Sequence, residues 1–279
     1  MVGDMAGARR VRFELPGRGG AVAGLEFGPA EEPVRLVFSH ANGFNARTYA
    51  GVLAGLGVRC LAVDARGHGR TQLPTVAEGR RTWDDMKDDL VALVESLDLR
   101  DVVLAGHSMG ATVSVLAAAE AGARVRSLLL LEPVIMARDA TGEPAESPLV
   151  QGTLRRRARF ESREAALAGF VGRGPFRAWS EAMLADYLGD GLREADDAVE
   201  LACAPAWEVS NYLAQAHDVR AALGRVTAPV RILKAETGST CRLEAAPGHV
   251  EITIVPGTTH FLPMERPDVA VEALKAALA

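Results

Sequence analysis

Short apolar runs alternate with helical patterns along the first half of this 279-residue chain. The runs cover residues 34–38, 60–63, 102–105 and 128–131. Near-continuous apolar runs of this length are typical of parallel strands that are covered on both faces. Between them, apolar residues recur on one helical face over 86–97, and residues 109–121 form an alanine-rich helical pattern. The alternation predicts an α/β fold, with a mostly parallel sheet and helices on both of its faces.

The alternation stops after Glu132. From residue 135 to residue 225 the strand signal disappears, and the stretch has the pattern of helices broken by glycine and proline. Strand patterns return at 230–233 and 250–255, and an amphipathic helix over 267–279 follows. We therefore predict a core formed by residues 1–134 and 226–279, interrupted by a helical insertion over 135–225.

Composition excludes several classes of protein. The chain has 31 basic and 36 acidic residues, a net charge of −5, so it lacks the electrostatic footprint of a nucleic-acid-binding protein. Residues 1–10 lack the apolar region of a signal peptide, and no apolar run is long enough to span a membrane. The histidines and the three cysteines stand in no metal-ligand spacing. We expect a cytoplasmic protein that acts on a small molecule, with no metal, cofactor, nucleic acid or membrane partner.

Residues 106–110 read Gly-His-Ser-Met-Gly and fit the pattern G-x-S-x-G. The motif directly follows an apolar strand and directly opens a predicted helix, which is the strand–turn–helix setting of a nucleophilic serine. Such a turn is sharp, so glycine is needed at 106 and 110 to avoid clashes. The turn lifts the Ser108 hydroxyl above the sheet and directs the helix N-terminus at charge that develops there.

Four other segments accompany this motif in order. They are 39–44 (Ser-His-Ala-Asn-Gly-Phe), 64–69 (Asp-x-Arg-Gly-His-Gly), 229–236, and 257–263 (Gly-Thr-Thr-His-Phe-Leu-Pro). With them the chain resembles the α/β-hydrolase fold superfamily over nearly its whole length, although Ala41 replaces a usual glycine. The resemblance implies an eight-stranded, mostly parallel sheet, and it implies that the insertion over 135–225 folds over the site as a lid.

An alcohol is a poor nucleophile at neutral pH, so Ser108 needs a neighbouring base. The resemblance assigns that role to His260, whose imidazole would take the Ser108 proton and later return it to the leaving group. The tetrahedral intermediate also needs backbone N–H donors. One is expected from Met109, the residue after the nucleophile, and the resemblance places the other at Asn42.

The acid that would orient His260 is less directly indicated. The family's usual position aligns with Gly238, which has no carboxylate. Two candidates remain, Glu132 and Glu236, and some members of the superfamily place their acid where Glu132 stands. We favour Glu132, because an acidic residue directly after four leucines is costly to bury without a partner. The alternative for Glu132 is a carboxylate that accepts hydrogen bonds from loop N–H groups.

Other polar residues near these segments have simpler interpretations. His40, His107 and His68 are expected to brace loops through hydrogen bonds. The arginine run over 155–159 could attract an anionic substrate, but a solvated helix face is the more expected role.

A serine nucleophile implies acyl chemistry through a covalent acyl-enzyme. Hydrolysis of an ester, or of a thioester, of a small apolar substrate is the favoured function, because an alcohol leaves more readily than an amine. Two alternatives remain open. One is another reaction on the same residues, namely C–C bond hydrolysis, acyl transfer or a lyase reaction. The other is a non-catalytic protein that uses the pocket only to bind a ligand.

Overall fold

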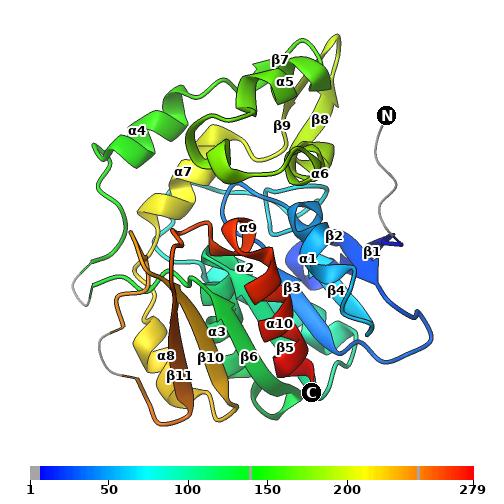
Figure 1. Ribbon diagram of the computed structural model, residues 1–279, viewed down its shortest axis with the longest axis vertical. Coiled ribbons are helices and arrows are strands. Elements are labelled where there is room, and N and C mark those ends of the chain that lie inside the picture. The colour runs from blue at the N-terminus through cyan, green and yellow to red at the C-terminus, as the bar shows by residue number, and fades with distance from the viewer. Residues whose placement is uncertain (1–6, 138–139, 244–245) are drawn as a thin grey trace.

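The computed structural model describes residues 7–137, 140–243 and 246–279 (Figure 1). Most of the first ten residues, for which no signal peptide is predicted, therefore lie outside the described part. In the order β1-β2-β4-β3-β5-β6-β10-β11, eight strands form one sheet. Only β1 and β2 run antiparallel to their neighbours. The predicted eight-stranded, mostly parallel sheet is thus confirmed. Its strands are β1 (Arg9–Leu15), β2 (Gly20–Phe27), β3 (Leu36–Ser39), β4 (Cys60–Val63), β5 (Val102–His107), β6 (Val125–Leu131), β10 (Val230–Ala235) and β11 (Val250–Val255).

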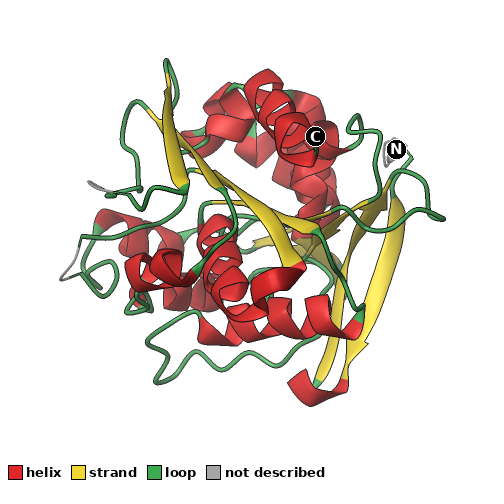
Figure 2. Ribbon diagram, turned by 90° about the horizontal axis from the view of Figure 1, so that it is seen from below, coloured by secondary structure: helices red, strands yellow, loops and turns green. Residues whose placement is uncertain are grey.

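Helices cover both faces of this sheet (Figure 2). One face packs against α2 (Asp84–Ser96), α3 (Met109–Ala121) and α8 (Val219–Arg225), and the other packs against α1 (Ala50–Leu53) and α10 (Pro267–Leu278). In α3 every residue from 109 to 118 is buried, because the helix lies between the sheet and its neighbouring helices. The short elements beside this layer are α9 (Leu262–Glu265) and the 3-10 turns η1 (Pro16–Arg18), η2 (Ala46–Tyr49) and η3 (Gly122–Arg124).

Between β6 and β10 the chain leaves the sheet layer and forms the upper part of the molecule in Figure 1. Its helices are α4 (Pro148–Arg155), α5 (Arg163–Phe170), the 3-10 turn η4 (Gly174–Ala178), α6 (Glu181–Gly191) and α7 (Pro205–Leu213). The last helix before β10 is α8, which packs against α3 in the layer below. The division of the chain into a core and a lid stays a prediction.

The expectation that residues 135–225 are purely helical is wrong. They also form a three-stranded antiparallel sheet of β7 (Arg159–Phe160), β9 (Ala198–Leu201) and β8 (Leu192–Ala195). Strands β8 and β9 are joined by a two-residue turn at 196–197, where Asp196 has a φ of +52°. The strands are too short to stand out among helical patterns, although Val199, Glu200 and Leu201 alternate in burial.

Partly buried ion pairs attach α6 to the sheet layer. Asp190 of α6 accepts two hydrogen bonds of 2.9 Å from Arg10 of β1 and a third, also of 2.9 Å, from Arg70. Arg47 of η2 contacts Asp186, one turn earlier on α6, at 3.1 Å. Bidentate arginine–carboxylate pairs fix geometry as well as charge. The upper part of the molecule is therefore held at a defined place over the carboxyl edge of the sheet.

Candidate active site

Ser108 lies in a strained turn between β5 and α3. Its φ of +54° and ψ of −120° are rare for a residue with a side chain, and such strain is common at functional positions. A Cβ on Gly106 would lie 2.6 Å from the Gly110 carbonyl carbon, and one on Gly110 would lie 2.2 Å from the Ser39 oxygen. Both distances are far below normal contact. The predicted need for glycine on each side of Ser108 is therefore confirmed.

The structure brings Ser108, His260 and Glu132 into one hydrogen-bonded chain. His260 Nε2 lies 2.9 Å from Ser108 Oγ, and His260 Nδ1 lies 3.1 Å from Glu132 Oε2. The three residues follow β5, β11 and β6, whose carboxyl ends meet at the same edge of the sheet. Parallel strands thus assemble groups that are up to 152 residues apart in sequence.

Glu132 is fully buried and has a φ of +49°. Burial opposes ionisation of its carboxyl, but hydrogen bonds with His260, Ser239 and two backbone N–H groups outweigh burial and lower its pKa to about 2. The N–H donors are Ala235 at 2.8 Å and Thr240 at 3.0 Å. Glu132 is therefore ionised at neutral pH. It serves both of the roles considered from the sequence, since it caps loop N–H groups and also contacts His260.

Glu236 has a different position. Its side chain is exposed, and its Oε2 accepts a hydrogen bond of 2.9 Å from Gly257 N. The carboxylate that contacts His260 is that of Glu132.

The three remaining histidines of these segments brace loops, as predicted. His40 and His68 each use one ring nitrogen to accept a backbone N–H, from Ala65 at 2.9 Å and from Gly43 at 3.0 Å. His107 bridges the Tyr49 hydroxyl and the His260 carbonyl oxygen. Burial lowers the pKa of His40 to about 4 and that of His107 to about 3. These rings are neutral at pH 7 and hold the backbone around the site.

Two backbone N–H groups remain available beside Ser108. In the loop over 41–44, the N–H groups of Ala41, Gly43 and Phe44 donate to Tyr49 Oη, His68 Nε2 and the Ala41 oxygen. The N–H groups of Asn42 and Met109 donate to no other group within the part of the chain that the structure describes. Both residues line the same cavity as Ser108 and His260. The two positions predicted to supply oxyanion donors therefore line the same cavity as the nucleophile, and their role as oxyanion donors stays a prediction.

The cavity has a volume of about 780 Å³ and extends from Ser108 under the segment over 135–225. Aromatic side chains make up much of its wall, and two of them, Phe170 and Phe176, meet edge to face with ring centroids 5.0 Å apart. The other aromatic residues that line it are Phe44, Trp83, Tyr187, Tyr212 and Phe261. Its dimensions and character suit a small, largely apolar ligand.

The arginine run behaves differently from the expected solvated helix face. Arg156 lines the cavity and forms an ion pair of 2.6 Å with the buried Glu208 of α7. Arg157 lies over the Phe160 ring, and Arg159 pairs with Asp197 at the surface. Helix α4 ends at Arg155, so the residues after it no longer share a helical face. The prediction of a solvated helix face over 155–159 fails because it assumed that the helix continues beyond Arg155.

The described residues hold neither a metal-ion cluster nor a membrane-spanning helix. They contain no group of three or more His, Cys, Asp or Glu side chains that could hold a metal ion. No helix among them has the length and apolar character needed to cross a membrane.

Comparison with known proteins places this geometry in a family. The model of the alpha/beta hydrolase family matches residues 36–274. The chain belongs to the α/β-hydrolase family. Among curated relatives, it is 26% identical over 251 residues to the 2-(acetamidomethylene)succinate hydrolase of Mesorhizobium japonicum, and the match covers 86% of each chain.

Solved structures show the same fold. The crystal structure of E-2-(acetamidomethylene)succinate hydrolase superimposes with a TM-score of 0.77 at 23% identity, covering 97% of this chain and 99% of that one. A thioesterase domain from the curacin biosynthetic pathway also gives a TM-score of 0.77, at 17% identity, covering 97% of this chain and 98% of that domain. At these identities the superpositions establish the fold, and the chemistry has to be argued from the site.

Proposed function

We propose that this α/β-hydrolase is a serine hydrolase that cleaves an ester, or a thioester, of a small and largely apolar substrate through an acyl-enzyme. The observation that carries the proposal is the hydrogen-bonded chain from Ser108 Oγ through the His260 ring to the ionised Glu132. A strained serine, a base within hydrogen-bond reach and an acid that orients the base are the requirements for an activated nucleophile.

In the first step Ser108 Oγ attacks the carbonyl carbon while its proton passes to His260 Nε2. The carbonyl oxygen becomes an oxyanion, which accepts hydrogen bonds from the N–H groups of Met109 and Asn42. The bond from carbon to the leaving alcohol or thiol then breaks as His260 returns the proton to the leaving group. A water molecule attacks the acyl-enzyme by the same route. Glu132 keeps His260 in the required tautomer and stabilises its cationic form.

The cavity supports a small substrate with apolar groups. Most of its aromatic wall comes from the segment over 135–225, and the rest comes from Phe44, Trp83 and Phe261. We propose that this segment acts as a lid, which would cover the bound substrate and exclude bulk water from the site. The curated relative from Mesorhizobium japonicum is named as a hydrolase, which is consistent with hydrolysis by this chain. Esters are favoured here because an alcohol leaves more readily than an amine.

The test is hydrolysis of a panel of p-nitrophenyl esters with short alkyl and aryl acyl groups. We expect turnover by the wild type and a loss of kcat on the order of 10⁶ in Ser108→Ala. The matched control is Ser96→Ala, which removes a hydroxyl on α2 that bonds only to the Leu93 carbonyl. A fluorophosphonate should add one adduct, located on Ser108 by mass spectrometry. Retained activity in Ser108→Ala would overturn the mechanism.

The same panel separates the alternatives. A matched p-nitroanilide tests amide cleavage. An adduct on Ser108 without turnover of any ester or amide would favour C–C hydrolysis, acyl transfer or a lyase reaction at this serine. Absence of both adduct and turnover would favour a protein that only binds a ligand.

A further inference from the structure

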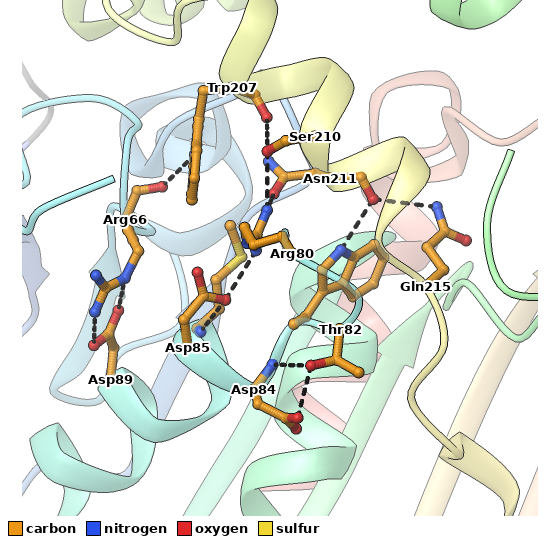
Figure 3. Close-up of polar contacts among 12 residues, drawn as sticks. Arg66, Arg80, Thr82, Asp84, Asp85, Asp89, Trp207, Ser210, Asn211 and Gln215 are labelled. Atoms are coloured by element: carbon orange, nitrogen blue, oxygen red, sulfur yellow. Dashed lines mark hydrogen bonds and ion pairs between the residues drawn. The ribbon is translucent and has the colours of Figure 1, made fainter. Parts of the chain in front are cut away.

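Helix α7 is docked on the sheet layer although it belongs to the segment over 135–225. Its residues from Trp207 to Asn211 are all buried. Trp207 Nε1 donates to the Arg66 carbonyl oxygen at 2.9 Å, and Trp83 Nε1 donates to the Asn211 carbonyl oxygen at 3.0 Å (Figure 3). The Arg80 guanidinium lies 4.3 Å from the centre of the Trp207 ring. Side chains from the loop before α2 thus hold this helix on the sheet layer.

The docked helix also holds the side chain of Asn42. The Asn42 Nδ2 donates to the Glu208 carbonyl oxygen at 3.0 Å, and its Oδ1 accepts from Asn211 Nδ2 at 2.8 Å. Both ends of the Asn42 amide are therefore bonded to α7. The backbone N–H of the same residue has no acceptor among the described residues, and Asn42 lines the cavity. The Asn42 side chain thus fixes the position of this residue, and the backbone N–H of Asn42 stays available to donate to a ligand.

Arg80 sets the orientation of the Asn211 amide. Its Nη1 lies 2.5 Å from Asn211 Oδ1, and its Nη2 lies 2.8 Å from Asp85 Oδ1 on α2. A guanidinium can only donate, so the oxygen of Asn211 must face Arg80 and its NH₂ must face Asn42. Asn211 is fully buried, which makes the alternative orientation costly. Donation thus runs from Arg80 to Asp85 on one side, and from Arg80 to Asn211 and on to Asn42 on the other.

We propose that Asn211 is a positioning residue that aims the Asn42 N–H at the oxyanion. The inference rests on the proposed function, since it assigns to the α7–Asn42 contact the task of holding one oxyanion donor in place. The hydrogen bond from the Asn42 N–H to the substrate oxygen is strongest in the transition state, because the negative charge forms on that oxygen there. Loss of the contact should therefore lower kcat and leave KM nearly unchanged.

The test uses Asn211→Asp in the full-length protein. Aspartate keeps an oxygen for Arg80 but replaces the NH₂ that donates to Asn42 with a second acceptor. We expect kcat for a p-nitrophenyl ester to fall about 10- to 100-fold, because a misaimed donor costs less than a deleted one. KM should change less than about threefold, and the affinity for phenylboronic acid, whose adduct is tetrahedral, should fall as much as kcat/KM does.

Two further variants separate positioning from folding. Ser210→Ala removes a neighbouring hydroxyl that bonds to Arg80 at 3.0 Å and to the Trp207 oxygen at 2.7 Å, without touching Asn42. We expect its kcat to stay within about twofold of the wild type. Asn42→Ala keeps the backbone N–H, frees it from α7 and adds no charge, so it should show the same fall in kcat as Asn211→Asp. The double variant should lose no more than either single variant.

The outcomes are distinguishable from failure of the proposed function. If Ser108→Ala is inactive while Asn211→Asp and Asn42→Ala keep wild-type kcat, the positioning role is wrong and the serine mechanism stands. Additive losses in the double variant, or unchanged boronate affinity, would also overturn the positioning role. If Asn211→Asp does not fold, Asn42→Ala with its boronate affinity decides alone. Melting temperatures of all variants identify a purely structural loss.

Discussion

The two sides of the cavity are built in different ways. On the sheet side, Ser108 and Glu132 are buried at the ends of adjacent parallel strands, and both hold positive φ angles that the surrounding backbone enforces. On the other side, α5 buries only Ala166, and α4 buries only Val150 and Thr153. The reacting groups thus lie on the rigid side, while the wall that contacts a substrate is loosely packed. Helices α6 and α7 are exceptions, because α6 buries Leu184, Tyr187, Leu188 and Asp190, and α7 is buried along five consecutive residues.

The difference predicts that substitutions on the sheet side change kcat, whereas substitutions in the loosely packed wall change KM. The largest effect is expected for Glu132→Gln. Glutamine cannot stabilise the cationic form of His260, so kcat should fall on the order of 10⁴-fold with KM nearly unchanged. The control is Glu236→Gln, whose exposed carboxylate contacts Gly257 N. A large loss of kcat in Glu236→Gln, and not in Glu132→Gln, would instead identify Glu236 as the acid.

The second prediction compares glycines on the two sides. Gly110→Ala places a methyl group 2.2 Å from the Ser39 carbonyl oxygen, so the turn must shift. We expect the free energy of unfolding to fall by about 3 kcal/mol, the cost of a severe overpacking. Gly169→Ala in α5 meets only the Phe160 ring, at 3.9 Å, and should raise stability by up to about 1 kcal/mol. Urea unfolding of both variants measures the contrast, and equal effects would contradict it.

The third prediction concerns the stability of the protein at low pH. Hydrogen bonds to the carboxylate hold the pKa of Glu132 at about 2, below its ordinary value of 4.5. A carboxyl with a lowered pKa stabilises the folded state above its unfolded pKa, and that stabilisation is lost as the pH falls towards the folded pKa. The stability advantage of the wild type over Glu132→Gln should therefore shrink between about pH 5 and pH 2, by on the order of 2 kcal/mol. A constant difference in urea unfolding across this range would contradict the buried ionised state.

The smallest effect is expected in the wall. Phe170→Ala removes an aromatic surface of the cavity that lies 5.0 Å from the Phe176 ring centre. KM for an aryl ester should rise about five- to tenfold, because about 1 kcal/mol of apolar contact is lost, and kcat should stay within about twofold. An acetate ester, whose acyl group carries only a methyl and so makes less apolar contact, serves as the control. A fall in kcat for both esters would show that the wall also positions the reacting groups.

Local patterns predicted much of the molecule correctly. The apolar runs and strand patterns predicted β3, β4, β5, β6, β10 and β11 of the large sheet, because a strand covered on both faces needs a largely apolar sequence. The motif at 106–110 predicted the strained turn. Its glycines are required because a side chain at 106 or 110 would clash with residues nearby in the chain or with the neighbouring strand. The predictions failed where short elements depend on distant partners. Strand β7 has two residues and forms only against β9, and Arg156 turns into the cavity only because α4 ends one residue earlier.

The sequence by itself therefore determined the sheet, the strained serine and the family, since each follows from residues that are close together in the chain. Tertiary structure decided which carboxylate contacts His260, because Glu132 and Glu236 both follow strands that end at the same edge of the sheet. It also decided that α7 holds the loop of Asn42, through a hydrogen bond between residues 169 positions apart. An amide has no sequence pattern that specifies its partner, and only the packing of α7 against the sheet layer brings the two asparagines together.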